Sequence, residues 1–358
     1  MAAEAIQPQI PPEKAFKESF CVAIPTAGSP IKLQNASPTE FLSTADKSMI
    51  NWIDCTADDI FKDANGYATT LGFEQSLVPG LISSLVGPYA AYAAYEDLTK
   101  NLGLMLTAIT SVKKQVEVSP IIILVRKNLI LTIHDSKTMH LKRFARYADI
   151  FMRKLPNEDR LWQDRNTIVI HRIIEEICDK NFEKLRTIAE RAEEFEEQLV
   201  EYRAAEREEI NRQIFRLKRN LLIFLRTLWA TRDVVHSLKY GDAELITDDT
   251  KLLERFTIVS DDLARQISLT ENIMELLTDG ITMLSTLAQS ELQVLSNKMM
   301  AITAWLTVVA TVILVPNTIA TFFGIYTPPW PLIWIIVLLL ISGIISGWIS
   351  WLWIKRIK

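Results

Sequence analysis

The chain has 358 residues, of which 49% are apolar and 23% charged, and its formal net charge at pH 7 is −4. This length allows two domains that each bury a core, and the slightly acidic balance excludes a general attraction to nucleic acid. The three cysteines are scattered without a CxxC spacing, which favours reduced thiols over a metal or redox role.

The N-terminal part is predicted to be an α/β domain over 19–160, after a Pro-rich polar segment (1–18) that we expect to be flexible and to contain no cleavable signal peptide. Helical spacing predicts helices over Asp58–Leu71 and Phe144–Lys154. Alternating apolar runs predict strands at Phe20–Pro25, Met49–Cys55, Ile121–Val125 and Leu129–His134. The last two are expected to form a hairpin. Asp54 is expected to end the second strand.

Two long amphipathic helices are predicted to form an antiparallel pair over 161–248, where Gly and Pro are nearly absent and apolar residues recur every three or four positions. Between them lies the acidic run Glu190–Glu197. We favour the solvated face of a long helix for this run, and a cation-collecting surface is the alternative.

A third helical pattern extends over 249–326; no stop signal separates its first part from Ala301–Val315, and it has no charged residue from Met299. One chain cannot cover a helix of this length, so we expect it to pack against other helices or against copies of itself. Oligomerisation of the protein is the economical inference.

The C-terminal part is predicted to be a membrane hairpin, because Met299 to Ile354 contains no Asp, Glu, Lys or Arg. This interval fits two spans of about 20 residues with a turn between them. Prolines interrupt the helical pattern after the first span. We expect membrane helices at 299–325 and 332–354, joined by a short extracytoplasmic loop at 327–331.

The orientation of the hairpin follows from its flanking charges. Lys298 precedes the first span, a basic tail (355–358) follows the second, and the loop is uncharged. The positive-inside rule therefore places both termini in the cytoplasm. We expect a multi-pass protein of the cell (inner or plasma) membrane, with the lipid bilayer as a partner.

Several segments, in their order along the chain, resemble the CorA family of divalent-cation (magnesium) transporters and channels, from about residue 45 onward. The resemblance implies a cytosolic α/β domain, long helices leading into a two-helix C-terminal transmembrane hairpin, and a funnel-shaped homopentamer. It also implies transport of a divalent cation such as Mg²⁺ and no enzymatic cofactor. The segments that carry the resemblance, besides the terminal hairpin, are Trp52–Asp54, Leu129–His134, Arg226–Leu238, Ser296–Met299, Thr307–Thr311 and Pro316–Gly324.

The chain departs from the family at the signature Gly-Met-Asn, whose asparagine forms a ring at the outer mouth that receives the hydrated cation. Gly324, Ile325 and Tyr326 occupy this position, or, in a second register, Thr327–Pro329 replaces the signature. The asparagine is absent in both registers. We expect the fold to survive the loss of the asparagine. Without this asparagine, magnesium selectivity can no longer be assumed.

In the family the first membrane helix lines the pore, and the spacing of one face of 299–325 is consistent with that role. A ring of amide and hydroxyl oxygens suits Mg²⁺, which keeps its bound waters. The face also includes Leu314, which with Leu306 is a candidate for a hydrophobic gate that closes by dewetting, with ordinary helix packing as the alternative. The pore-lining candidates are Thr303, Thr307, Ala310, Asn317 and Thr321.

Asn317 also has an alternative role, a hydrogen bond that holds membrane helices together. Thr311 and Thr318 lie off the face and are expected to bond back to their own helix. Regulatory sites of the family use carboxylates between neighbouring subunits. The candidates for such sites are Asp97, Asp261 and Asp262, with an ordinary solvated surface as the alternative.

Three other functions were weighed against divalent-cation transport. An enzyme is disfavoured because the four histidines form no metal-binding motif and no Gly-rich phosphate loop is present. Proton-coupled transport of zinc or another transition metal is weakened by the absence of His and Cys from both spans. A non-conducting, membrane-anchored helical scaffold would tolerate loss of the signature, and ion flux in proteoliposomes would separate it from a transporter.

Overall fold

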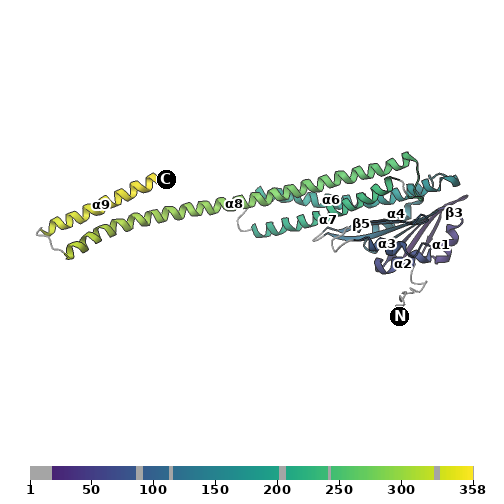
Figure 1. Cartoon of the computed structure of the whole chain (residues 1–358), viewed down its shortest axis with the longest axis horizontal. Helices are drawn as coiled ribbons and strands as arrows, with labels where there is room; N and C mark the ends of the chain where they lie inside the picture. Colours follow the sequence, from purple (N-terminus) through teal and green to yellow (C-terminus); the bar gives the residue numbers. More distant parts are fainter. Residues whose placement is uncertain are drawn as a thin grey trace, which may run out of the picture. The chain divides into compact units, whose positions relative to one another are not determined.

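A computed structural model of the chain (Figure 1) describes residues 18–85, 92–112, 116–200, 207–240, 243–325 and 331–357. The chain divides into two compact units, Met1–Ile281 and Thr282–Lys358. The first unit holds a sheet with helices on both faces, and the second holds a helical hairpin.

The sheet of the first unit has seven strands in the order β2-β1-β3-β7-β6-β5-β4. β3 and β7 are parallel and the other neighbours are antiparallel. The predicted hairpin joins β6 to β7, and Asn128 in its turn has φ 63°, a left-handed conformation that Asn tolerates. The strands are β1 (Ser19–Pro25), β2 (Ile31–Gln34), β3 (Ser48–Ala57), β4 (Ala94–Asp97), β5 (Leu102–Ser111), β6 (Glu117–Arg126) and β7 (Leu129–Asp135).

Helices cover both faces of this sheet and create two apolar cores (Figure 1). Because strand side chains alternate between faces, Ile50 and Trp52 enter one core while Ile53 and Cys55 enter the other. One face is covered by α1 (Pro38–Ala45), α2 (Ile60–Thr70) and α3 (Leu77–Ser83). The other is covered by α4 (Met139–Tyr147), α5 (Asp149–Met152), α6 (Trp162–Val200), α7 (Arg207–Lys239) and the start of α8 (Thr250–Ile325). A 3₁₀ turn, η1 (Asp159–Leu161), lies between α5 and α6.

Asparagine side chains fasten the long helices to the sheet. β4 pairs with β5 only from Leu102 to Met105, and among the described residues no strand pairs with the rest of that edge. Asn181 of α6 fills the gap: its Oδ1 accepts from the Ile109 amide at 2.8 Å and its Nδ2 donates to the Thr107 carbonyl at 2.9 Å. A buried backbone edge is thereby satisfied by one side chain.

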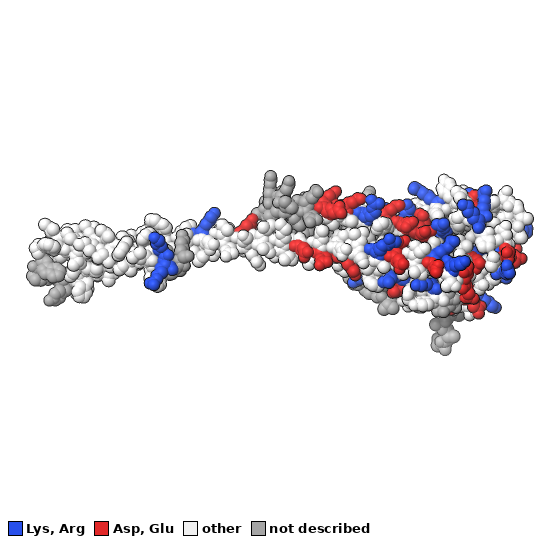
Figure 2. All heavy atoms as spheres, turned by 90° about the horizontal axis from the view of Figure 1, so that it is seen from above, with Lys and Arg blue, Asp and Glu red and all other residues white. Residues whose placement is uncertain are grey.

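The second unit contains the rest of α8 and α9 (Leu332–Ile357). Both helices are long and apolar enough to cross a membrane. None of the most apolar stretch of α8 and only 6% of that of α9 is buried within the chain. In Figure 2 this unit is almost free of charged side chains, whereas acidic and basic groups cover the first unit. These features are expected of a hairpin surrounded by lipid.

The predicted strands are present, but some elements differ from expectation. Asp54 was expected to end its strand, and this was wrong, because it lies inside β3 opposite Thr132. The helix expected from Phe144 is instead the α4–α5 pair, which begins at Met139. α9 continues through the expected basic tail to Ile357. Six elements were not predicted: β2, β4, β5, α1, α3 and η1.

Candidate functional site

One face of α8 in the second unit packs against α9. The half-buried residues of this face recur at helical spacing and include Val308, Thr311 and Val315. Thr311 shares a hydrogen bond of 3.0 Å with Ser350, and the Ser346 hydroxyl donates to the Thr311 carbonyl at 3.3 Å. These contacts define the inner face of the hairpin.

Two glycines of α9 allow this close packing. A Cβ atom added to Gly347 would lie 2.6 Å from Val312 Cγ2, and one added to Gly343 would lie 3.1 Å from Pro316 Cγ. Gly343 and Gly347 have the Gly-x-x-x-Gly spacing that lets membrane helices approach closely. The hairpin is therefore held by backbone proximity and small polar groups.

The opposite face of α8 is left uncovered by the residues that the structure describes. At about 100° per residue it points roughly 180° away from the inner face. All of its members are exposed, and it is the face that the sequence singled out: Thr303, Leu306, Thr307, Ala310, Leu314, Asn317, Thr321 and Gly324. We call this set the outer face of α8.

The threonines of the outer face donate their hydroxyl protons to their own helix. The hydroxyls of Thr303 and Thr307 lie 2.9 Å from the carbonyl oxygens of Met299 and Thr303, and that of Thr321 lies 2.8 Å from the Asn317 carbonyl. Thr311 and Thr318, which lie off this face, also bond back as predicted. A hydroxyl that has donated its proton can still accept hydrogen bonds, so the outer face presents acceptors to water.

Asn317 differs from the threonines. It is exposed, and within the part of the chain that the structure describes its carboxamide makes no hydrogen bond. A primary amide in hydrocarbon costs several kcal/mol unless it finds a partner. Asn317 therefore does not fasten α8 to the described part of α9.

The two leucines proposed as a gate are also exposed. Leu306 and Leu314 expose 64% and 62% of their surface, so neither is packed inside the chain. Leu314 also lines a shallow groove of about 520 Å³ on α8, together with Thr307 and Ala310. This exposure leaves both side chains available for contacts outside the chain, with lipid or with another copy.

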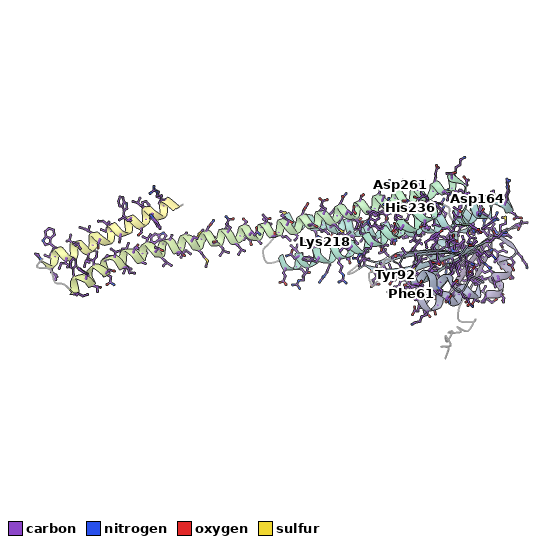
Figure 3. All side chains as sticks on the ribbon, in the orientation of Figure 1. Phe61, Tyr92, Asp164, Lys218, His236 and Asp261 are labelled. Carbon is purple, nitrogen blue, oxygen red and sulfur yellow. The ribbon has the colours of Figure 1, made fainter. Side chains whose placement is uncertain are left out.

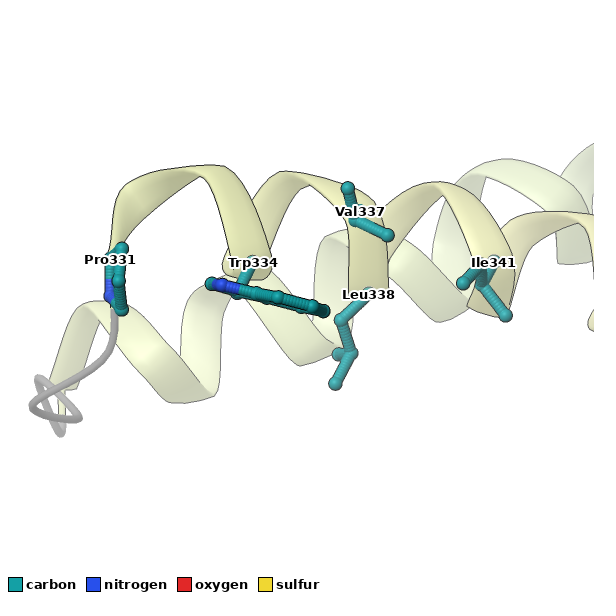
Figure 4. A pocket seen from close by; sticks show the side chains of 5 residues that line it. All are labelled: Pro331, Trp334, Val337, Leu338 and Ile341. Carbon is teal, nitrogen blue, oxygen red and sulfur yellow. The ribbon is translucent and has the colours of Figure 1, made fainter.

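The C-terminal end of α8 bears the residues that take the position of the family signature in one of the two registers. Gly324 and Ile325 are exposed at the end of the helix, and a Cβ atom on Gly324 would meet nothing within 4 Å. Tyr326 and 327–330 of the predicted loop lie outside the described residues. A second groove of about 530 Å³ lies on α9 (Figure 4), and its lining is apolar except for one indole N–H: Pro331, Trp334, Val337, Leu338 and Ile341. It offers no ligands for an ion.

The three candidate regulatory aspartates do not converge in one chain. Asp97 ends β4 and accepts a hydrogen bond from the Thr99 amide at 3.1 Å. Asp262 forms an ion pair with Arg265, and Asp261 is exposed on α8 (Figure 3). Among the residues described, no group of three or more His, Cys, Asp or Glu side chains is placed to hold a metal.

A buried polar network in the sheet was not predicted from the sequence. Asp54 accepts a hydrogen bond of 2.6 Å from the Thr132 hydroxyl, and its second oxygen lies 3.2 Å from His134 Nε2. The Trp52 indole donates to Thr132 at 3.0 Å, and His134 Nδ1 donates to the Asp135 carbonyl at 2.7 Å. Burial alone lowers the pKa of His134, but the Asp54 carboxylate and the Asp135 carbonyl outweigh it and raise that pKa. Because side chains alternate along a strand, these groups lie on one side of the paired strands β3 and β7. Their proximity depends on the register of the two strands, which the sequence alone does not give.

Known proteins resemble this chain over nearly all of its length. The model of the family described as CorA-like Mg²⁺ transporter protein matches residues 48–356. The cobalt/magnesium transport protein CorA of Methanocaldococcus jannaschii is 26% identical over 242 residues, which is 63% of this chain and 71% of that protein.

Solved structures show the same fold. The complete CorA magnesium transporter of Methanocaldococcus jannaschii has a TM-score of 0.63 at 21% identity, covering 93% of this chain and 96% of that one. Full-length CmaX has a TM-score of 0.60 at 14% identity, over 95% and 96%. The cytoplasmic domain of ZntB from Vibrio parahaemolyticus has a TM-score of 0.56 at 12% identity, over 76% and 98%. With the family match across both units, these findings show that the chain belongs to the family of CorA-like Mg²⁺ transporter proteins.

Proposed function

We propose that the chain forms a homopentamer in which the outer face of α8 lines a pore for Mg²⁺ or a related divalent cation. The observation that carries this proposal is Asn317, a membrane-span amide without a partner on a face that α9 leaves uncovered. Membership of a Mg²⁺ transporter family supports the class of substrate. Copies arranged around an axis would enclose the polar outer faces and leave α9 toward lipid.

The proposed pore passes its ion with the hydration shell in place. Mg²⁺ dehydrates reluctantly, and the proposed lining from Thr303 to Thr321 contains neutral oxygens and no carboxylate. Amide and hydroxyl groups can hydrogen-bond the waters of the ion without replacing them. Rings of Leu306 and Leu314 would close the path by dewetting, and Gly324, Ile325 and Tyr326 would form an outer mouth without the family's asparagine.

The same proposal orients the protein with both termini in the cytoplasm. The α/β unit then lies in the cytoplasm, where it could bind regulatory cations. In this proposal Asp97, Asp261 and Asp262 would bind such cations only between neighbouring copies. Zinc transport is less well supported. The likeness to ZntB, at 12% identity, shows the fold alone, and the spans contain no His or Cys to bind a soft metal.

Flux through proteoliposomes that contain the Asn317→Leu variant tests the proposal. The substitution turns a hydrating ring into an apolar one, so Mg²⁺ flux should fall to near the background of empty vesicles while the oligomer persists. Thr318→Val is the matched control: it is one residue away, off the outer face, and its hydroxyl bonds to its own helix at 2.7 Å. Normal flux through an intact Asn317→Leu oligomer would remove the outer face from the conduction path.

The same variant distinguishes the alternative role of Asn317. If the amide holds copies together, its loss should weaken assembly by about 1 kcal/mol per contact, and flux should fall only in proportion to the oligomer lost. Mass measurement of the variant in detergent therefore accompanies every flux measurement.

A further inference from the structure

Helix α7 carries an exposed apolar stripe that no described part of the chain covers. Phe215, Leu222 and Trp229 expose 63%, 43% and 43% of their surface and recur at intervals of seven residues. Their face is turned by about 100° from Ile214 and Leu221, the residues that directly precede two of them and are buried in the core. Apolar side chains at heptad spacing form the seam along which helices of different chains pack.

Basic residues alternate with the apolar residues of this stripe. Arg219 and Arg226 lie four residues after Phe215 and Leu222, on the same face, and Arg216 lies beside it. All three are exposed. Arg216 and Arg219 form no ion pair with any residue that the structure describes. The stripe therefore presents apolar surface and positive charge together.

The exposed face of α8 in the first unit has the complementary charge. Five exposed carboxylates recur along it, and none forms an ion pair within the described chain: Glu254, Asp261, Glu271, Glu275 and Asp279. The half-exposed Leu276 lies beside them. This surface would suit a partner that combines arginines with apolar side chains.

The two faces lie at matching levels along their helices. Lys218 Nζ of α7 donates to Thr278 Oγ1 of α8 at 2.8 Å, so the two helices are neighbours (Figure 3). They run antiparallel, and each residue advances about 1.5 Å. Arg219 is therefore level with Glu275 and Asp279, and Arg226 is level with Glu271. A second copy related by rotation about an axis along these helices keeps the levels aligned.

We propose that the carboxylate face of α8 in one copy docks on the α7 stripe of the next copy. The contact uses different surfaces on the two copies, and such a contact closes into a ring when repeated by rotation. Two α7 stripes facing each other would oppose arginine to arginine, which charge repulsion disfavours. The inference rests on the proposed self-assembly and assigns it a surface outside the membrane.

Cross-linking of full-length protein in detergent tests this contact. Cys21, Cys55 and Cys178 are 0%, 1% and 4% exposed, so introduced cysteines should react selectively. The double variant Leu222→Cys, Glu275→Cys, treated with a bifunctional maleimide, should yield covalent multimers of the chain. Each single variant, and the control pair Leu222→Cys with Arg172→Cys on α6, should not.

A charge exchange provides an independent measurement. Reversal of Arg216 and Arg219 to Glu should raise the protein concentration at which the assembly dissociates by about tenfold, because opposed charges at an interface repel. Adding Glu275→Lys and Asp279→Lys should restore it. The same reversal at Arg143 and Arg146 on α4, both exposed, should have no effect.

The outcomes separate this contact from the assembly itself. A full-size oligomer that yields no multimers from the double variant overturns the docking surface and leaves the proposed assembly standing. A monomeric wild-type protein overturns both. If anionic lipid vesicles protected Leu222→Cys from the maleimide and the double variant gave no multimers, the stripe would be assigned to the membrane surface instead.

Discussion

The buried pair of Asp54 and His134 shows how a single proton can matter to the sheet. His134 Nδ1 is 2.7 Å from a carbonyl oxygen, which only accepts, so Nδ1 carries a proton. Nε2 and the Asp54 carboxyl then share a second proton across 3.2 Å. Both side chains are almost completely buried. Removing the shared proton would leave an uncompensated carboxylate between β3 and β7, which is strongly unfavourable.

Stability of the α/β unit should therefore fall as pH rises above neutrality. The folded pKa of His134 is raised above its ordinary value of 6.5, so the folded state holds more protons than the unfolded state in that range. The stabilisation is complete below pH 6.5 and is lost as the pH passes the folded pKa. Asp54→Asn should cost about 3–5 kcal/mol at pH 6 and flatten this alkaline dependence. Thermal unfolding of the full chain in detergent from pH 4 to 9 measures both effects.

His140 is the control for that measurement, because its shift has the opposite sign. Burial, with a smaller contribution from the charge of His134 and nearby lysines, lowers the pKa of His140 to about 4. Its neutral form stabilises the fold above pH 6.5, and this contribution is lost as the pH falls toward 4. His140→Gln should weaken the acid limb of the stability profile, to which the lowered pKa values of His171 and Asp149 also contribute, and leave the alkaline limb. An alkaline limb unchanged in Asp54→Asn would contradict the shared proton.

At the scale of elements, the hairpin depends on glycine where α8 and α9 touch. Gly347 faces Val312 so closely that a methyl group would lie 2.6 Å from Cγ2 of the valine. Distances below 3.0 Å force one partner to move, and separation of the helices would also lengthen the Thr311–Ser350 hydrogen bond of 3.0 Å. Close packing is the main attraction between helices in lipid.

Gly347→Ala should therefore destabilise the hairpin by about 1–3 kcal/mol, the range for overpacking. Gly324→Ala is a control of identical chemistry in the same unit, because a Cβ atom there meets nothing within 4 Å. The midpoint of thermal unfolding in detergent should fall for Gly347→Ala and should not fall for Gly324→Ala. Equal midpoints for the two variants would show that Val312 can turn aside without loss.

Sequence patterns found the long helices and four of the strands, and missed β5 and most of the short elements. The alternating strands β1, β3 and β7 and the helical stripes of α6 and α7 have clear periodicity. β2 and β4 have four residues each, too few to show a period. β5 is buried almost throughout and includes Gly103, so its apolar run is not distinguishable from a helical segment. The order of the sheet depends on contacts that no local pattern encodes.

The candidate site was predictable where it depended on helical spacing. The spacing of Thr303 to Thr321 placed these residues on one face, and only the structure shows that α9 covers the opposite face. The Asp54–His134 pair was missed because it depends on the parallel register of β3 and β7. Contacts between copies lie beyond any single chain, so the structure does not bear on the expectation that the candidate aspartates act between subunits.

At the scale of the whole molecule, the chain has a charged part suited to water and an uncharged part suited to lipid. The interval from Met299 to Ile354 has no charged side chain, and charges resume on both sides of it, at Lys298 and at Lys355 with Arg356. The loop between the spans has no charge to hold it in the cytoplasm. Lys and Arg next to membrane spans remain on the cytoplasmic side, so both ends of the hairpin should face the cytoplasm.

Labelling of single cysteines in intact cells tests this orientation. The native thiols are buried, and burial raises the pKa of Cys21 and of Cys178 to about 12, so neither forms the reactive thiolate at neutral pH. A membrane-impermeant maleimide should label Thr327→Cys in the loop from outside. It should label Ser290→Cys, which is exposed on α8 eight residues before Lys298, only after the cells are opened. If Ser290→Cys were labelled in intact cells and Thr327→Cys were not, the hairpin would have the opposite orientation, and the α/β unit would lie outside the cell.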